Sequence, residues 1–198
     1  MLEIRLHGRG GQGAVTAAEL IAVAAYYDGK ESQAFPSFGV ERRGAPIESY
    51  ARISEKKIRL REQIYCPDYI IILDPTLLDA VDVLSGAKCT TEAAINSDLS
   101  VNDLIKKYPD LKKIKKVHSI PATKMAIDLL GAPIINTIML GFFAGITKLI
   151  KKDSMNKAIS ERFGGALAEK NIKAAGDAYN MGTRKHENTR LRLKTQKQ

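Results

Sequence analysis

The residues best suited to chemistry form a glycine loop close to the N-terminus. Gly8, Gly10 and Gly13 follow the spacing G-x-G-x-x-G, which permits a tight turn and brings backbone N–H groups close to a phosphate. Two interpretations are open from the residues alone. Either the loop binds a phosphate, or the glycines let the next helix pack closely on the preceding strand. The candidate binding residues in this loop are Gly8, Arg9, Gly10, Gly11, Gln12 and Gly13.

A second loop, between Pro36 and Pro46, adds candidate binding residues at the same place. These are Phe38, Gly39, Glu41, Arg42 and Arg43. Because both loops follow early strands, we expect them to meet in one crevice, where Arg9 and the arginine pair would suit a polyphosphate or an acidic partner. The alternative is that Glu41 pairs with one arginine and that the loop is a contact between subunits.

An ordinary NAD site is disfavoured, because it needs an acidic residue at the end of the second strand to hold a ribose hydroxyl. Here residues 33–36 read Gln-Ala-Phe-Pro. No catalytic centre is visible either. His7, His118 and His186 have no metal-binding neighbours at a useful spacing, so we expect structural roles for them. Asp74 is expected to cap the helix that follows it.

The elements that position these loops alternate between strand and helix patterns. Leu2, Ile4 and Leu6 alternate with polar residues, and an alanine-rich helix is predicted over residues 14–27. The other predicted strands cover residues 32–35, 47–53, 58–60, 69–73, 93–96 and 116–119. The other predicted helices cover residues 74–84, 121–130, 136–150, 154–162 and 166–181, with Gly141 and Gly145 permitting close helix packing. This order predicts an α/β fold: a three-layer, mostly parallel, Rossmann-like sheet with a helical C-terminal part, and a ligand crevice at the carboxyl ends of its strands.

Composition and charge limit the possible partners. The 198 residues carry a net charge of +9, but residues 106–116 and 182–198 hold +5 each, so the remainder is near neutral. Their one aromatic residue, Tyr108, does not make a series of aromatic side chains between the basic ones, which favours a solvated surface over nucleic-acid binding. The most apolar run, residues 134–150, is shorter than the roughly 20 residues that span a bilayer. We therefore expect a cytoplasmic chain without nucleic-acid or membrane partners, and a flexible basic tail over residues 182–198.

Three motifs resemble the gamma subunit of pyruvate:ferredoxin oxidoreductase and related 2-oxoacid:ferredoxin oxidoreductases. They are residues 3–18 (EIRLHGRGGQGAVTAA), 33–46 (QAFPSFGVERRGAP) and 58–61 (IRLR). The resemblance continues through residues 69–76, 133–141 and 158–172, and covers a single gamma domain over residues 1–181. It departs at residues 88–99, where the family has a strongly apolar strand, and in the basic tail.

The resemblance implies a multi-subunit enzyme that decarboxylates a 2-oxoacid on thiamine diphosphate with Mg²⁺. Electrons pass through [4Fe–4S] clusters to ferredoxin, and acyl-CoA is released. With only two cysteines, this chain is expected to bind none of these cofactors alone and to be silent by itself. The alpha, beta and delta subunits would be its partners and would carry them.

The resemblance assigns assembly and coenzyme A handling to the chain, at residues 8–13 and 39–44. Two alternatives stay open: a free-standing NAD(P)-binding oxidoreductase domain, and a purely structural assembly subunit.

Overall fold

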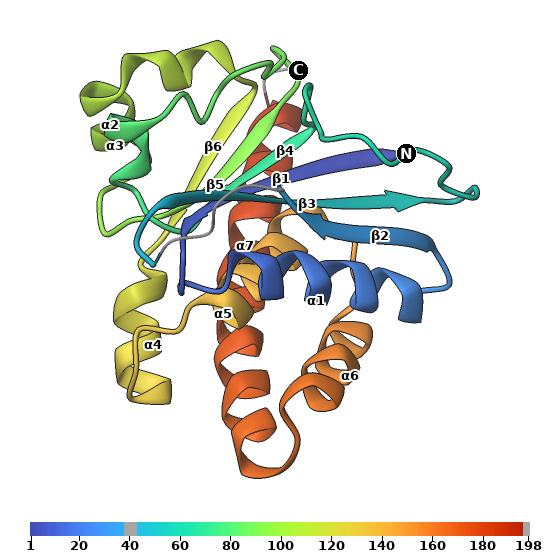
Figure 1. Cartoon of the computed structure of the whole chain (residues 1–198). Helices are drawn as coiled ribbons and strands as arrows, with labels where there is room; N and C mark the ends of the chain where they lie inside the picture. The colour runs from blue at the N-terminus through green and yellow to red at the C-terminus, as the bar shows by residue number, and fades with distance from the viewer. Residues whose placement is uncertain (38–42, 196–198) are drawn as a thin grey trace.

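The computed structural model describes residues 1–37 and 43–195, with side chains as far as Glu187. Its centre is one six-stranded sheet with the strand order β2-β3-β1-β4-β5-β6 (Figure 1). The strands are β1 (Leu2–Arg9), β2 (Glu31–Pro36), β3 (Pro46–Ser54), β4 (Tyr69–Ile72), β5 (Glu92–Asn96) and β6 (Lys116–Ile120). Strands β1, β4, β5 and β6 pair in parallel, and β3 pairs antiparallel with both β1 and β2. The predicted mostly parallel sheet is confirmed.

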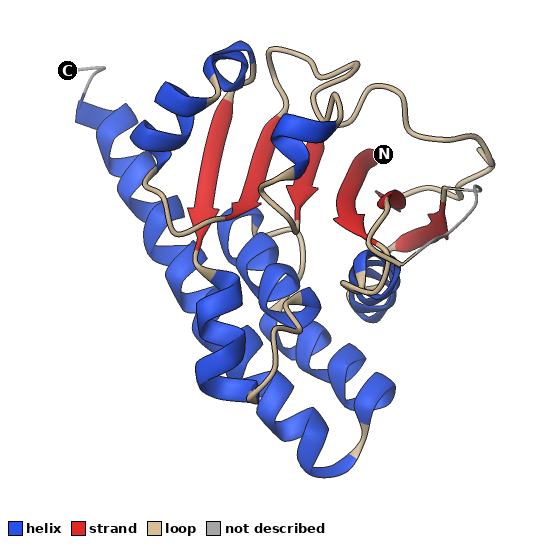
Figure 2. Cartoon of the chain, turned by 60° about the vertical axis from the view of Figure 1, so that its left-hand side comes forward, coloured by secondary structure: helices blue, strands red, loops and turns tan. Residues whose placement is uncertain are grey.

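Helices cover both faces of the sheet and produce the predicted three layers (Figures 1 and 2). One face carries α1 (Ala14–Tyr27), α4 (Ala122–Leu130), α5 (Asn136–Thr147), α6 (Lys152–Phe163) and α7 (Gly165–Thr195). The other carries α2 (Leu77–Ala80), α3 (Val101–Lys107) and the short 3-10 helix η1 (Pro109–Lys113). Each face has its own apolar core. Strand β4 is buried between them, which explains its continuous run of isoleucines.

Helices α5 and α7 approach each other closely because glycines line their contact. A Cβ atom added at Gly141 would lie 2.1 Å from the carbonyl oxygen of Ala175, and one at Gly145 would lie 2.3 Å from that of Tyr179. These distances are far below van der Waals contact, so the two positions accept only glycine. The predicted packing role of the glycine pair is confirmed. No helix within the described part of the chain combines the length and apolarity needed to cross a membrane.

Four sequence-based predictions of elements are wrong. Residues 58–60 form no strand, and the helix predicted over residues 74–84 covers only Leu77–Ala80. Helices α3 and η1 cover Val101–Lys107 and Pro109–Lys113, where the sequence pattern predicts no helix. The last helix continues to Thr195 rather than ending at residue 181.

Three of these departures have a physical reason in the contacts of the chain. The chain leaves α2 because the carbonyl oxygens of Val83 and Ser85 accept hydrogen bonds from the buried guanidinium of Arg5. Helix α3 begins with Ser100 as its N-cap and buries Leu104, while its lysines face solvent. In α7, Gly182 is a residue of the type that commonly follows the end of a helix. In the structure it instead allows the backbone of α5 to come close, because a Cβ there would lie 2.7 Å from the oxygen of Phe142.

Candidate functional site

A cavity of about 410 Å³ opens where the parallel strands end. It is lined by the glycine loop, by residues that follow β4 and β5, and by the starts of α4 and α5. The lining residues are Gly10, Gly11, Gln12, Arg43, Leu73, Asp74, Pro75, Asn96, Thr123, Pro133 and Ile135. This is the carboxyl edge of the sheet, where α/β folds bind ligands. The cavity thus lies where the sequence predicts a crevice, at the carboxyl ends of the strands.

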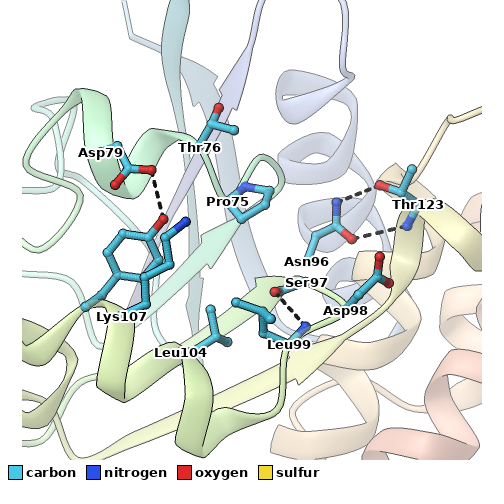
Figure 3. A pocket seen from close by; sticks show the side chains of 11 residues that line it. Pro75, Thr76, Asp79, Asn96, Ser97, Asp98, Leu99, Leu104, Lys107 and Thr123 are labelled. Atoms are coloured by element: carbon cyan, nitrogen blue, oxygen red, sulfur yellow. Dashed lines mark hydrogen bonds between the residues drawn. The ribbon is translucent and has the colours of Figure 1, made fainter.

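A second cavity of about 380 Å³ adjoins the first and shares Pro75, Asn96 and Thr123 with it. Figure 3 shows Asn96 between the two, donating to the Thr123 hydroxyl at 2.8 Å and accepting from the Thr123 backbone N–H at 3.1 Å. Sequence reasoning missed both residues. Their signal was position alone, because Asn96 ends a parallel strand and Thr123 lies in the first turn of the helix after the next strand.

The glycines of the loop have different surroundings: two lie close to neighbouring side chains, and one has open space around it. A Cβ at Gly8 would lie 3.0 Å from the Cβ of Ala14, and one at Gly13 would lie 2.9 Å from Asn136 Nδ2. These two glycines therefore allow α1 to pack. Gly11 has a φ of +93° and open space where a Cβ would be, so its conformation is what requires glycine there. The packing interpretation is thus confirmed for Gly8 and Gly13, and phosphate binding by the loop stays a prediction.

The carboxylate of Asp74 fixes the shape of the loop. Its Oδ2 atom accepts from Arg9 Nε at 3.0 Å and from Gln12 Nε2 at 2.9 Å, and Oδ1 accepts from the backbone N–H of Thr76 at 2.9 Å. Burial works to raise the pKa of Asp74, but the hydrogen bonds from Thr76 and Gln12 and the charge of Arg9 hold it below its ordinary value. Asp74 therefore has two roles: Oδ1 caps the turn that leads into α2, as predicted, and Oδ2 braces the glycine loop.

The side chain of Arg9 forms hydrogen bonds within the chain. Besides Asp74, its guanidinium donates to the carbonyl oxygen of Gly44 at 3.1 Å and to the hydroxyl of Thr76 at 2.8 Å. Arg9 therefore ties the two loops together with three of the five N–H groups of its guanidinium.

The two loops meet, as expected. Gly10 forms a β-bridge with Arg43, and the Gly10 N–H donates to the oxygen of Ala45 at 2.9 Å. Arg43 is exposed and lines the cavity. The other candidates of the second loop, Phe38, Gly39, Glu41 and Arg42, lie outside the described residues.

Hydrogen-bond donors converge on the cavity. Helices α1, α4 and α5 all begin beside it, and each helix N-terminus carries a partial positive charge. Within the described residues, the backbone N–H groups of Gly11 and Gly13 have no acceptor. Together with the Arg43 side chain, these groups favour a negatively charged ligand.

The histidines lie in structural surroundings, in agreement with the sequence. Burial lowers the pKa of His7 to about 4, and its Nε2 atom accepts from Arg5 Nε at 3.1 Å. His118 is buried 3.2 Å from Glu92, and the hydrogen bond from His118 lowers the pKa of Glu92 to about 2. His186 Nδ1 lies 2.8 Å from the oxygen of Ile146. Within the ranges that it describes, the structure has no cluster of three or more metal-ligating side chains.

The topology also bears on the dinucleotide alternative. A dinucleotide fingerprint places the second strand beside the first, so that an acidic residue at its end reaches the ribose. Here β3 lies between β1 and β2 and runs antiparallel to both. Strand β2 ends in Pro36 without an acidic residue. The glycine loop therefore lacks the surroundings of an NAD site.

Comparison with known proteins gives a consistent result. The family model described as pyruvate ferredoxin/flavodoxin oxidoreductase matches residues 3–181. The pyruvate synthase subunit PorC of Methanocaldococcus jannaschii is 53% identical over 186 residues, covering 94% of this chain and 99% of the relative. The pyruvate/ketoisovalerate oxidoreductases common subunit gamma of Thermococcus kodakarensis is 51% identical, with coverage of 91% and 96%. The crystal structure of pyruvate oxidoreductase subunit PORC from Thermotoga maritima superposes with a TM-score of 0.76 at 30% identity, covering 90% of this chain and 95% of that one.

Proposed function

Because the chain belongs to the pyruvate ferredoxin/flavodoxin oxidoreductase family, we propose that its carboxyl-edge cavity handles coenzyme A in the assembled enzyme. Its relatives are gamma-type subunits, and the chain is the gamma subunit of a multi-subunit 2-oxoacid:ferredoxin oxidoreductase. In the overall reaction the bond between the carboxylate carbon and the keto carbon breaks and CO₂ leaves. The acyl carbon then bonds to the sulfur of coenzyme A, the thiol proton is released, and the electron pair passes to ferredoxin.

Coenzyme A fits the donors of the cavity by its chemistry. Its diphosphate and ribose phosphate need N–H donors and cations, and its pantetheine arm needs a neutral groove. Gly11 and the exposed Arg43 line the cavity and supply donors, since the Gly11 N–H has no acceptor among the described residues, and the start of α1 lies directly after this loop. Leu73, Pro133 and Ile135 supply apolar lining. This convergence of unpaired donors is the single observation that carries the proposal.

We propose that the other steps belong to the alpha, beta and delta subunits. Thiamine diphosphate with Mg²⁺ and the [4Fe–4S] clusters would lie there, because clusters need sets of cysteine thiolates and this chain has two cysteines in all. The relative from Thermococcus kodakarensis is named as a subunit common to pyruvate and ketoisovalerate oxidoreductases. By the same logic, choice of the 2-oxoacid would lie outside this chain.

The test is kinetic and uses the complete complex with Arg43→Ala in this subunit. If Arg43 contacts a phosphate, the KM for coenzyme A rises about tenfold, the lower end of the loss of one charge-assisted hydrogen bond, about 1.5–3 kcal/mol. The KM for the 2-oxoacid stays unchanged. Lys112→Ala serves as the matched control, because Lys112 is exposed on η1, away from the lining of this cavity.

Two results would count against the proposal. An unchanged KM for coenzyme A in an intact Arg43→Ala complex would show that Arg43 does not contact a phosphate of coenzyme A. Loss of the subunit from the complex would assign Arg43 to an interface, which is the purely structural alternative.

A further inference from the structure

The connection between β3 and β4 is a long loop with no helix or strand. It spans 14 residues, from Glu55 to Asp68, and it projects from the sheet beside the N-terminus of the chain (Figures 1 and 2). Structureless loops longer than about 12–15 residues are uncommon in compact domains and usually have a function. The loop also contains the motif at residues 58–61, for which the cavity gives no role.

Four basic side chains in this loop have no partner among the residues that the structure describes. Lys56, Lys57, Arg59 and Arg61 are all exposed, and none makes a side-chain hydrogen bond or ion pair with any residue that the structure describes. We call residues 56–61 the basic loop. Exposed Glu55 and Glu62 flank the basic loop on either side, so residues 55–62 carry four basic and two acidic side chains.

The lysine-rich stretch on α3 and η1 provides the contrast. There Lys106 pairs with Asp103 at 3.5 Å, Lys113 with Asp110 at 2.8 Å, and Lys115 with Glu92 at 2.7 Å. Much of that positive charge is therefore compensated within the chain. The concentration of uncompensated charge lies instead on the basic loop.

The segment directly after the basic loop is held firmly. Arg52, which is fully buried, donates to the oxygen of Glu62 at 2.8 Å. Arg5 donates to the oxygen of Ile64 at 3.4 Å. A Cβ at Gly86 would lie 1.9 Å from the oxygen of Tyr65, so the neighbouring loop packs tightly against this one. Hydrogen bonds from two buried guanidinium groups thus hold the backbone that follows the basic loop. A loop held in this way loses less conformational entropy when it binds a partner.

The same surface offers apolar anchors and free backbone. Leu60 is 42% exposed and Tyr65 is 66% exposed. The backbone groups of residues 57–61 make no hydrogen bond within the described chain, although the alternating sequence is typical of a strand. Arginine and tyrosine around a small apolar centre, with unpaired backbone beside them, are features of protein interfaces.

We propose that the basic loop, with Tyr65, is the docking surface for an acidic face of another subunit of the oxidoreductase. This proposal rests on the chain being one subunit of a complex, and not on the coenzyme A site. Carboxylates of the partner would pair with Arg59 and Arg61, and its apolar side chains would cover Leu60 and Tyr65. The free backbone of residues 57–61 would pair with extended chain of the partner.

The test is charge reversal in the complete complex. Arg59→Glu with Arg61→Glu should weaken retention of this subunit at least tenfold, measured by the subunit ratio in native mass spectrometry across a dilution series. The matched control is Lys106→Glu with Lys112→Glu, which makes the same change of charge on α3 and η1 and should leave the ratio unchanged. The melting temperature of the full chain should be the same for both double variants, because none of these side chains packs in the core.

A photo-reactive amino acid at Leu60 in the assembled complex gives the second readout. A crosslink to an acidic segment of another subunit supports the proposal. A crosslink to nucleic acid, or no crosslink in an intact complex, overturns it, as does equal retention of both double variants. Normal retention combined with an altered KM for coenzyme A would overturn the docking surface alone. Lost retention with normal coenzyme A kinetics in the surviving complex would support it.

Discussion

At the scale of single residues, the site is shaped by side chains that bind one another rather than a ligand. Asp74 holds Arg9, Gln12 and Thr76 at once. The sequence shows that Arg9 lies within the glycine loop. It could not show that the guanidinium donates to Asp74, because that bond depends on where Asp74 lies after β4. Arg43 is the described arginine whose side chain faces the cavity with its charge available.

We expect Arg9→Ala to destabilise the chain and Arg43→Ala to leave its stability unchanged. Arg9 makes three side-chain hydrogen bonds, one of them to a carboxylate, and its loss leaves Asp74 partly unpaired. The free energy of unfolding should fall by roughly 1–3 kcal/mol, as measured by urea denaturation of the full chain. Equal stability of the two variants would show that the brace contributes nothing.

His7 should make the stability of the chain sensitive to acid. Its pKa falls from 6.5 to about 4 on folding because it is buried. Between these values the unfolded chain holds a proton that the folded chain does not. The free energy of unfolding should therefore decrease as the pH drops from 6.5 to 4, by up to roughly 3 kcal/mol.

The variant His7→Gln isolates this effect, because a glutamine oxygen can still accept from Arg5. It should flatten the dependence of stability on pH in that window, whereas His186→Gln, close to the C-terminal end of the described side chains, should not. A slope that stays the same in His7→Gln would assign the acid sensitivity to other groups.

At the scale of elements, the sequence predicted what depends on local pattern. The alternation of helices and strands that builds the parallel part of the sheet follows from runs such as residues 69–73 and 14–27. What it missed depends on distant contacts. Gly182 resembles a residue that ends a helix. In the structure glycine is required there because the backbone of α5 comes close. The strand pattern at residues 58–60 lacks a neighbouring strand in this chain, so pattern alone could not decide its structure.

The crossing of α5 and α7 gives a sharp test at this scale. Gly141→Ala would place a methyl group 2.1 Å from the oxygen of Ala175, so the helices must separate. We expect a loss of about 3 kcal/mol or more in the free energy of unfolding. Gly176→Ala in α7 is the control, because its Cβ would meet only the end of Lys152 at 3.6 Å, and alanine favours the helix. Comparable losses in both variants would contradict the close-packing account.

At the scale of the whole molecule, the chain is a subunit that positions groups for chemistry completed elsewhere. The carboxyl edge supplies donors for an anion, and the basic loop supplies charge for a partner. The resemblance found in the sequence is confirmed by relatives that are about half identical over nearly the full chain. The coenzyme A site stays a prediction, because the candidate residues Phe38, Gly39, Glu41 and Arg42 lie outside the described residues.

The isolated chain should therefore show no activity. With two cysteines it cannot hold an iron–sulfur cluster through four thiolates, so the pure chain should be colourless. Reduction of a viologen dye that depends on a 2-oxoacid should appear only with the other subunits present. Turnover by the chain alone, in preparations shown to be free of those subunits, would contradict this division of labour.

The most direct measurement is photoaffinity labelling of the complete complex with a coenzyme A analogue whose reactive group sits on the nucleotide end. The account predicts that mass spectrometry finds the label in this subunit, on peptides that contain residues 8–13, 43–45 or 133–136, and that excess coenzyme A prevents the labelling. Label found only on other subunits, with this chain present and unmodified, would contradict the account.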